Sequence, residues 1–133
     1  MYSMKAVCKE TNMPYETLKF YCNEGLVPNV KRSSNNYRVF DDEDIAWIKS
    51  LSCLKKCGMS IAEMKEYVGL CLQGEKTIPE RKIMLHHRKK LLLEKLQEIN
   101  DSIEYIDTKQ KFYDDVLAGK IPYISNLIKV SND

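Results

Sequence analysis

The chain has 133 residues, 44% hydrophobic and 30% charged, which suits one compact domain with one extended element added. No apolar run has the length of a membrane span, and the N-terminal MYSMKAVCKE lacks the apolar stretch of a signal peptide, so we expect a cytoplasmic protein. Its five cysteines are then expected to be free thiols. A net charge of +2 does not by itself indicate a nucleic-acid partner.

The first part of the chain predicts two short helices and a hairpin. Ser3 is placed to cap the first helix, and Pro14 suits the first turn of a second helix that ends at Gly25. Residues 29–31 and 37–40 predict two short strands around a polar, asparagine-containing turn.

Two further helices follow this hairpin. The acidic residues 41–44 suit the first turn of a third helix, which ends at Gly58. Ser60 and Glu63 form the capping-box pattern of a fourth helix, which ends at Gly74. We therefore expect residues 1–75 to form one domain.

The pattern changes from about residue 77, where apolar side chains recur at steps of three and four over about four and a half heptads. A helix of roughly 40 residues would be about 60 Å long, too long to be covered by a domain of this size. We expect residues 76–118 to form a self-paired coiled-coil dimerisation helix, followed by a short apolar tail, 119–133, that can fold back on a partner. The predicted dimerisation residues are Leu85, Leu92, Leu96, Ile99, Ile103, Ile106, Tyr113 and Leu117, and the seam is interrupted at Lys89 and Gln110.

A helix, a short turn, a helix and a basic hairpin form the layout of a winged helix-turn-helix, which sets one helix in the major groove and the wing against phosphates. The residues with suitable chemistry are Tyr15, Lys19, Phe20 and Tyr21 on the second helix, and Lys31, Arg32 and Arg38 on the hairpin. An ordinary α+β domain with a solvated basic loop remains the alternative.

The segments TLKFYCNEGLVP, NNYRVFDDEDIAWI and LKKCGMSIAEMKEY, in this order and spacing, resemble the MerR family of bacterial transcription regulators. The resemblance covers residues 2 to about 72, and the long helix resembles the family's antiparallel dimerisation helix. It implies a mainly α fold and a homodimer that binds double-stranded promoter DNA at a palindromic spacer. It also implies activation by DNA distortion, which would reach RNA polymerase indirectly. We expect no cofactor and no metal, and we expect no enzymatic activity because the sequence offers no nucleophile–base pair, carboxylate pair or phosphate loop.

Carried over by position, the resemblance implies DNA contacts from Thr17, Lys19, Phe20 and Tyr21 on the second helix, from Arg32, Tyr37 and Arg38 on the wing, and from Lys55 on the third helix. Lys19 stands where the family usually has an arginine, so a bidentate contact from a guanidinium is replaced by a contact from a single ammonium charge. Phe20 replaces a tyrosine, and Cys22 replaces an acidic residue.

The segment DIAWIKSLSCLKKCGMSI further resembles a small subgroup that responds to aldehydes and other thiol-reactive stress, in which one cysteine stands at the position of Cys53. The cysteine sets of metal-sensing and iron–sulfur members are lacking, and the adjacent His86 and His87 do not form a chelating pair. Cys53 is therefore the predicted sensor, with Cys57 as an accessory thiol.

Residue chemistry leaves two interpretations of Cys53 open. Lys49 and Lys56 lie about one turn away and favour the nucleophilic thiolate, but a free cysteine can equally be a small buried hydrophobe. Cys8, Cys22 and Cys71 lie on apolar helix faces and are expected in the core. The alternatives for the whole chain are a MerR-like regulator of another small ligand, with purely structural cysteines, and a coiled-coil interaction module without sequence-specific DNA binding.

Overall fold

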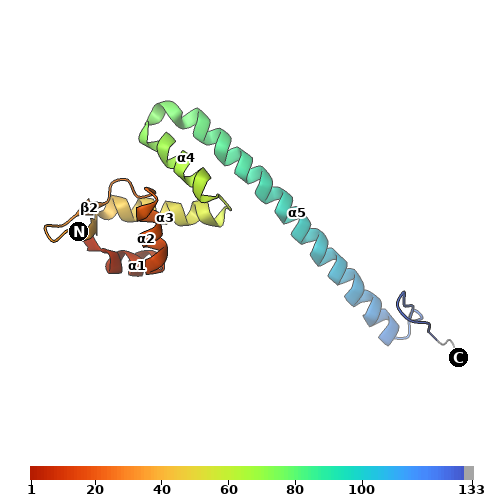
Figure 1. Cartoon of the computed structure of the whole chain (residues 1–133). Coiled ribbons are helices and arrows are strands. Elements are labelled where there is room, and N and C mark those ends of the chain that lie inside the picture. The colour runs from red at the N-terminus through yellow and green to blue at the C-terminus, as the bar shows by residue number, and fades with distance from the viewer. Residues whose placement is uncertain (131–133) are drawn as a thin grey trace. The chain divides into compact units, whose positions relative to one another are not determined.

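The computed structural model describes residues 1–130; the last three residues of the predicted tail, 131–133, lie outside the described residues. The chain forms two units, residues 1–90 and residues from 91 on, and the long helix runs through their boundary (Figure 1). In chain order the elements are β1 (Tyr2–Ser3), α1 (Met4–Thr11), α2 (Tyr15–Asn23), β2 (Lys31–Arg32), β3 (Arg38–Phe40), α3 (Asp42–Lys56), α4 (Ile61–Leu72), the 3-10 turn η1 (Glu75–Thr77) and α5 (Ile78–Leu117). The predicted mainly α architecture, with a small strand-paired wing and a long C-terminal helix, is confirmed.

The first unit has a continuous hydrophobic core under α1 to α4. α3 contributes an apolar stripe to this core, because Ile48, Leu51 and Leu54 are all buried. The completely buried side chains also include Val7, Leu18, Leu26, Phe40 and Met64, which come from five different segments. Burial of each such side chain stabilises the fold by about 1.5–3 kcal/mol. Together these side chains fix the positions of α1 to α4 relative to one another.

The sheet has three short antiparallel strands in the order β1-β3-β2. β2 and β3 form the predicted hairpin, with Lys31 opposite Val39 and Arg32 opposite Arg38. β1 was not expected from the sequence; it pairs Tyr2 with Phe40 and lays the N-terminus alongside the wing.

Local capping sets the ends of the helices. Ser60 accepts a hydrogen bond from the Glu63 amide at 3.1 Å, and the Glu63 carboxylate accepts one from the Ser60 amide at 3.3 Å, which confirms the predicted capping box. A second box, between Asp41 and Asp44, starts α3. Gly58 follows α3 with a φ of +88°, a conformation that side-chain-bearing residues rarely adopt, so it permits the sharp turn into α4.

None of the 40 residues of α5 is buried. The predicted seam is therefore uncovered in the single chain: its apolar side chains are between 39% exposed at Leu92 and 86% exposed at Leu117. Such a long uncovered apolar stripe is unusual on the surface of a monomer.

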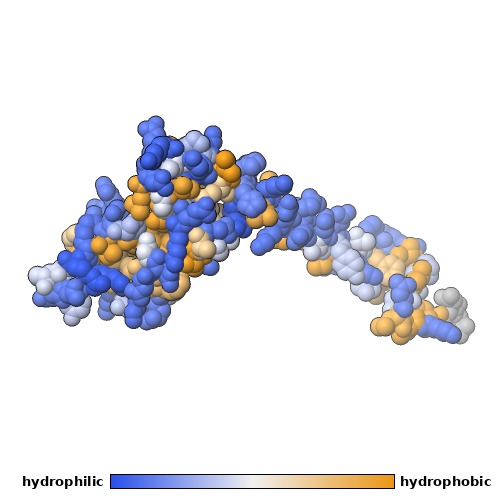
Figure 2. Space-filling view, turned by 45° about the horizontal axis from the view of Figure 1, so that its top comes forward, coloured by the Kyte–Doolittle hydropathy of each residue, from blue (hydrophilic) through white to orange (hydrophobic). Residues whose placement is uncertain are grey.

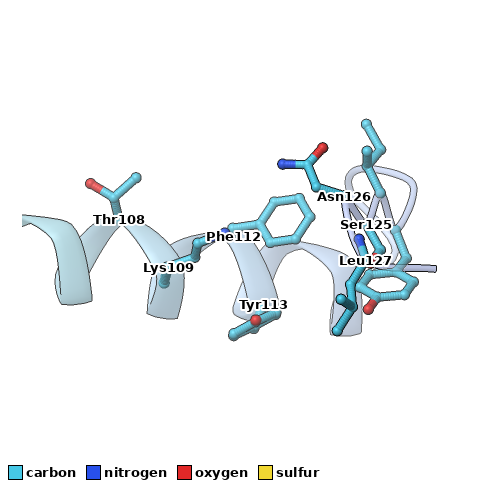
Figure 3. Close-up of a pocket in the computed structure, with 9 residues that line it drawn as sticks. Thr108, Lys109, Phe112, Tyr113, Ser125, Asn126 and Leu127 are labelled. Atoms are coloured by element: carbon cyan, nitrogen blue, oxygen red, sulfur yellow. The ribbon is translucent and has the colours of Figure 1, made fainter.

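In the second unit the tail packs against the last turns of α5. The Phe112 and Tyr123 rings lie 6.5 Å apart, centroid to centroid, and a cavity of about 600 Å³ separates the helix from residues 123–127. Figure 3 shows Phe112 projecting from the helix toward the loop that carries Asn126 and Leu127. Hydrophobic side chains gather at this C-terminal end of the chain (Figure 2), and Leu127 is 92% exposed.

Within the described residues, none of the helices is both long enough and apolar enough to cross a membrane.

Candidate nucleic-acid interface

The wing is a tight, ordered hairpin. The Ser33 amide donates to the Tyr37 carbonyl at 2.8 Å, and the Asn36 amide donates to the Ser33 carbonyl at 2.9 Å. Asn36 has a φ of +63°, which asparagine tolerates better than most residues. The turn therefore holds Arg32 and Arg38 side by side on paired strands.

A groove of about 310 Å³ lies where the wing, the start of α2 and the N-terminus meet, and we call it the wing groove. It is lined by Ser3, Met4, Lys5, Tyr15, Lys19, Arg32, Asn36, Tyr37 and Arg38. Five of the ten predicted DNA contacts thus come together in one concave surface with four cationic side chains. Sequence reasoning missed Lys5, because only the unpredicted β1 pairing brings it to the wing.

Two arginines of the wing groove are held in place by neutral partners. Arg38 donates to the Asn23 side-chain oxygen at 2.7 Å, and Arg32 donates to the Asn36 carbonyl at 3.0 Å. Neither bond neutralises the guanidinium, and each leaves several of its five N–H donors for other acceptors. The two cations are therefore positioned in advance for an anionic ligand.

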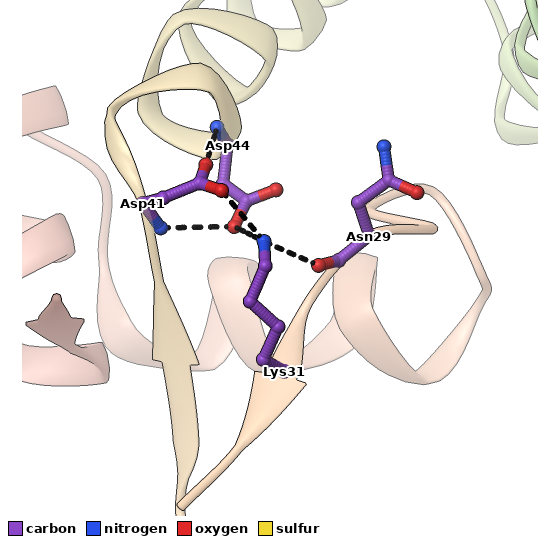
Figure 4. Close-up of polar contacts among 4 residues, drawn as sticks. All are labelled: Asn29, Lys31, Asp41 and Asp44. Carbon is purple, nitrogen blue, oxygen red and sulfur yellow. Dashed lines mark hydrogen bonds and ion pairs between the residues drawn. The ribbon is translucent and has the colours of Figure 1, made fainter.

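Lys31 does not line the wing groove, and its predicted role as a DNA contact stays a prediction. Its ammonium donates to Asp41 at 2.8 Å, to Asp44 at 3.0 Å and to the Asn29 carbonyl at 2.9 Å (Figure 4). The pKa of Lys31 is raised by the hydrogen bonds to Asp41 and Asp44, and that of Asp41 is lowered, first by its bond to Lys31. Strand geometry explains this position, since neighbouring residues on β2 point to opposite faces and only Arg32 faces the groove.

α2 distributes the predicted contacts over two faces. Tyr15, Lys19 and Phe20 are exposed, and Thr17 is half-buried. Tyr21 is only 4% exposed and is part of the core, where burial raises the pKa of its hydroxyl. Its predicted place among the DNA contacts is corrected, because its ring is not available to a ligand.

The sensor candidate Cys53 is exposed on α3. It opens onto a largely apolar groove of about 420 Å³, the Cys53 groove, lined by Trp47, Lys49, Ser50, Cys53, Leu54, Tyr67 and Leu85. The groove thus joins side chains from α3, α4 and the beginning of α5. The interpretation of Cys53 as a small buried hydrophobe does not hold in the single chain.

The other four cysteines are half-buried. Cys8 and Cys22 pack against the core as predicted, and burial raises the pKa of both thiols. Cys57 follows the last turn of α3, where its amide bonds to the Cys53 carbonyl. Cys71 is not part of the main core; its sulfur lies 3.9 Å from an Arg81 guanidinium nitrogen.

Lys55, the predicted phosphate contact of α3, is exposed near the end of that helix. Among residues 1–130 no group of three or more histidine, cysteine, aspartate or glutamate side chains is arranged to hold a metal ion.

Comparison with known proteins adds independent information. Residues 2–69 match the family described as MerR HTH family regulatory protein. An uncharacterized HTH-type transcriptional regulator of Haemophilus influenzae is 31% identical over 112 residues, which are 84% of this chain and 83% of that protein. The HTH-type transcriptional regulator AdhR of Bacillus subtilis is 39% identical over 88 residues, which are 66% of this chain and 63% of AdhR.

Solved structures show the same relationship. HiNmlR, a MerR family regulator lacking the sensor domain and bound to promoter DNA, superposes with a TM-score of 0.74 at 31% identity, over 88% of this chain and 93% of that chain. A protein of Listeria monocytogenes, assigned to the same family, superposes with a TM-score of 0.80 over 90% of each chain at 24% identity and so shares the fold. These relatives are regulators, which confirms the expectation that the chain is not an enzyme.

Proposed function

The chain belongs to the MerR family of helix-turn-helix regulatory proteins, and from this we propose that it binds a palindromic promoter as a homodimer and activates transcription in response to thiol-reactive electrophiles. Residues 1–75 are the DNA-binding domain, residues 76–118 the dimerisation helix and residues 119–133 a short tail. RNA polymerase is reached indirectly, through distortion of the bound DNA.

The wing groove carries the DNA-binding part of the proposal. It gathers Lys5, Lys19, Arg32 and Arg38 around a concave surface with exposed Tyr15 and Tyr37 at its walls. Cations contact phosphates, while the exposed face of α2 reaches base edges in the major groove. The related HiNmlR is bound to promoter DNA in its structure, which supports the assignment.

The charge distribution of α5 favours an antiparallel homodimer. Residues 78–97 carry six lysines or arginines and two acidic residues, whereas residues 98–117 carry six acidic residues and two lysines. Antiparallel pairing places each basic half beside an acidic half, and parallel pairing would bring like charges together. The uncovered seam of α5 supplies the apolar contact between the two copies.

Cys53 is the proposed point of chemical attack because it combines solvent exposure with an apolar groove that an organic electrophile can enter. With an aldehyde, the sulfur adds to the carbonyl carbon, the C=O π bond opens, and the thiol proton ends on the oxygen as a hemithioacetal. With an unsaturated carbonyl or quinone, the sulfur adds to the β-carbon and the proton ends on the α-carbon. Neither reaction needs an oxidant.

The DNA-binding part is tested with purified full-length chain and a duplex selected from a random library. We expect enrichment of an inverted repeat and a steep fall in affinity as salt rises. Binding without sequence preference and without salt dependence would instead support a coiled-coil interaction module.

The sensor part is tested with a promoter reporter in cells exposed to formaldehyde or a quinone. We expect Cys53→Ser to abolish induction while DNA affinity is kept, and Cys22→Ser, at a half-buried position, to retain induction. Full induction of Cys53→Ser would reject the thiol sensor and favour a regulator of another small ligand, with Cys53 and Cys57 purely structural.

A further inference from the structure

Arg38 is a wing residue that is held from outside the wing. Its Nη2 donates to the side-chain oxygen of Asn23 at 2.7 Å, and Asn23 is the last residue of α2. Arg32, by contrast, donates to the Asn36 carbonyl within the β2–β3 hairpin itself. Within residues 1–130, the bond between Asn23 and Arg38 is the one side-chain hydrogen bond that joins α2 to this hairpin. It therefore sets where the Arg38 guanidinium lies relative to the helix.

The end of α2 gives Asn23 a fixed base, because both α3 and α4 hold the residues that follow it. Glu24, the next residue, forms an ion pair with Lys65 of α4. Leu26 is completely buried, and its carbonyl accepts a hydrogen bond from the Trp47 indole N–H of α3 at 2.7 Å. A side chain anchored at this point can therefore position a partner from the wing with little freedom of its own.

The wing groove keeps its positive charge. None of the four cationic side chains that line it forms an ion pair with a carboxylate among residues 1–130. The Asn23 oxygen accepts a hydrogen bond but carries no net charge, so Arg38 is oriented and its charge is kept. An aspartate at this position would orient Arg38 as well, but its own charge would compete with a phosphate for the guanidinium.

We propose that Asn23 is a positioning residue for DNA binding, which holds the Arg38 guanidinium ready for a phosphate while α2 lies in the major groove. This inference rests on the proposed DNA binding and adds to it the residue that joins the helix and the wing. The contact lets the two engage the duplex as one body. Arg38 then does not have to be ordered when DNA binds, and a side chain that is ordered only on binding lowers affinity.

The first test is a double-mutant cycle on DNA affinity, with the purified full-length chain and the inverted-repeat duplex obtained by selection. We expect Asn23→Ala to weaken binding about tenfold, since each of the two wings of a dimer then has to order an arginine on binding. In the Arg38→Met background the same substitution should change affinity by less than about twofold. Asn29→Ala is the matched control, because Asn29 is exposed and its side chain forms no hydrogen bond within residues 1–130.

The second test separates orientation from charge through the salt dependence of DNA affinity. We expect Asn23→Asp to make this dependence as shallow as it is for Arg38→Met, because a guanidinium paired with a carboxylate releases fewer counterions. Asn23→Ala should keep the wild-type salt dependence, because the cation of Arg38 is still present. Asn29→Asp adds the same charge at another exposed asparagine of the domain and should keep it too.

The outcomes separate the inference from the proposed function. If Asn23→Ala weakens binding by the same factor in the wild-type and Arg38→Met backgrounds, Asn23 does not act through Arg38, and the inference is overturned while DNA binding stands. A wild-type salt dependence for Asn23→Asp would overturn it as well. A wild-type chain that selects no inverted repeat and binds DNA without salt dependence would reject the proposed DNA binding and the inference together.

Discussion

Arg88, on the first part of α5, binds both carboxylate oxygens of Glu63, at 2.9 and 2.8 Å from Nη2. The same carboxylate caps α4 by accepting from the Ser60 amide. Arg88 also lies over the turn between α3 and α4, because a methyl group at Gly58 would sit 3.4 Å from its Nη1. One ion pair thus ties the beginning of α5 to the junction between α3 and α4.

We predict that this pair contributes measurably to stability. Arg88→Met and Glu63→Gln, alone and combined, form a double-mutant cycle that is read by urea unfolding. Because the Glu63 side chain is 37% exposed, solvent weakens the interaction, and we expect a coupling free energy of about 0.5–1 kcal/mol. Additive effects of the two substitutions would mean that the contact does not stabilise the fold.

The same pair predicts a pH dependence. The pKa of Glu63 is lowered from its usual value of 4.5, first by the hydrogen bond to Arg88 and next by the Ser60 amide. A carboxylate with a lowered pKa in the folded state stabilises the protein above its unfolded-state pKa, and this contribution is lost as the pH falls through the folded-state pKa. The stability difference between wild type and Glu63→Gln should therefore shrink in acid, below the unfolded value near 4.5.

The control for this titration is Glu63→Gln measured in the Arg88→Met background. Without the guanidinium, the substitution should show a weaker dependence on pH. An equal dependence in both backgrounds would assign the effect to the α4 cap alone.

Lys31 and Arg32 are neighbours for which we predict opposite phenotypes. Arg32→Gln removes a cation from the wing groove and should weaken DNA binding to all sequences alike. The slope of the logarithm of the DNA association constant against the logarithm of the salt concentration should become less steep by about 1. Lys31→Gln should leave that slope unchanged. It should lower the midpoint temperature of thermal unfolding, because it removes the ammonium that pairs with the Asp44 carboxylate, which is only 4% exposed. DNA titrations at several salt concentrations and thermal unfolding check both variants. An altered salt slope for Lys31→Gln would return this residue to the DNA contacts.

Features that depend on neighbouring residues were predictable from the sequence. Ser60 and Glu63 specify their helix start within four residues, and the seam of α5 repeats so often that its length and exposed face follow directly. The wing hairpin likewise follows from strand-forming residues on both sides of an asparagine turn.

Features that depend on distant contacts were not predictable in the same way. β1 has two residues, and its pairing partner Phe40 lies far along the chain. Its absence from the prediction also hid Lys5. The orientation of Lys31 could have been anticipated, since alternation along β2 separates it from Arg32 and the acidic start of α3 offers it partners. The orientation of Tyr21 depended on the packing of the whole core.

The seam itself yields the most direct prediction for the assembly. In the proposed antiparallel dimer, Ile99→Asp places a carboxylate in the apolar seam of α5, and twofold symmetry buries two such charges per dimer. An unpaired buried charge costs at least about 3 kcal/mol, which corresponds to a dissociation constant weakened about 100-fold or more. Sedimentation equilibrium should then show monomer at concentrations where the wild type is a dimer.

Asn100→Asp is the matched control for this variant, because it adds the same charge one residue further along α5, at a position that flanks the seam and does not belong to it. It should sediment as the wild type does. The Ile99→Asp monomer should keep the fold of residues 1–90, because these residues form a unit with its own core. It should lose most of its affinity for an inverted-repeat duplex, since one DNA-binding domain contacts only one half-site. If Ile99→Asp dimerises as tightly as Asn100→Asp, the copies pair through another surface, and the seam of α5 is not the dimer interface.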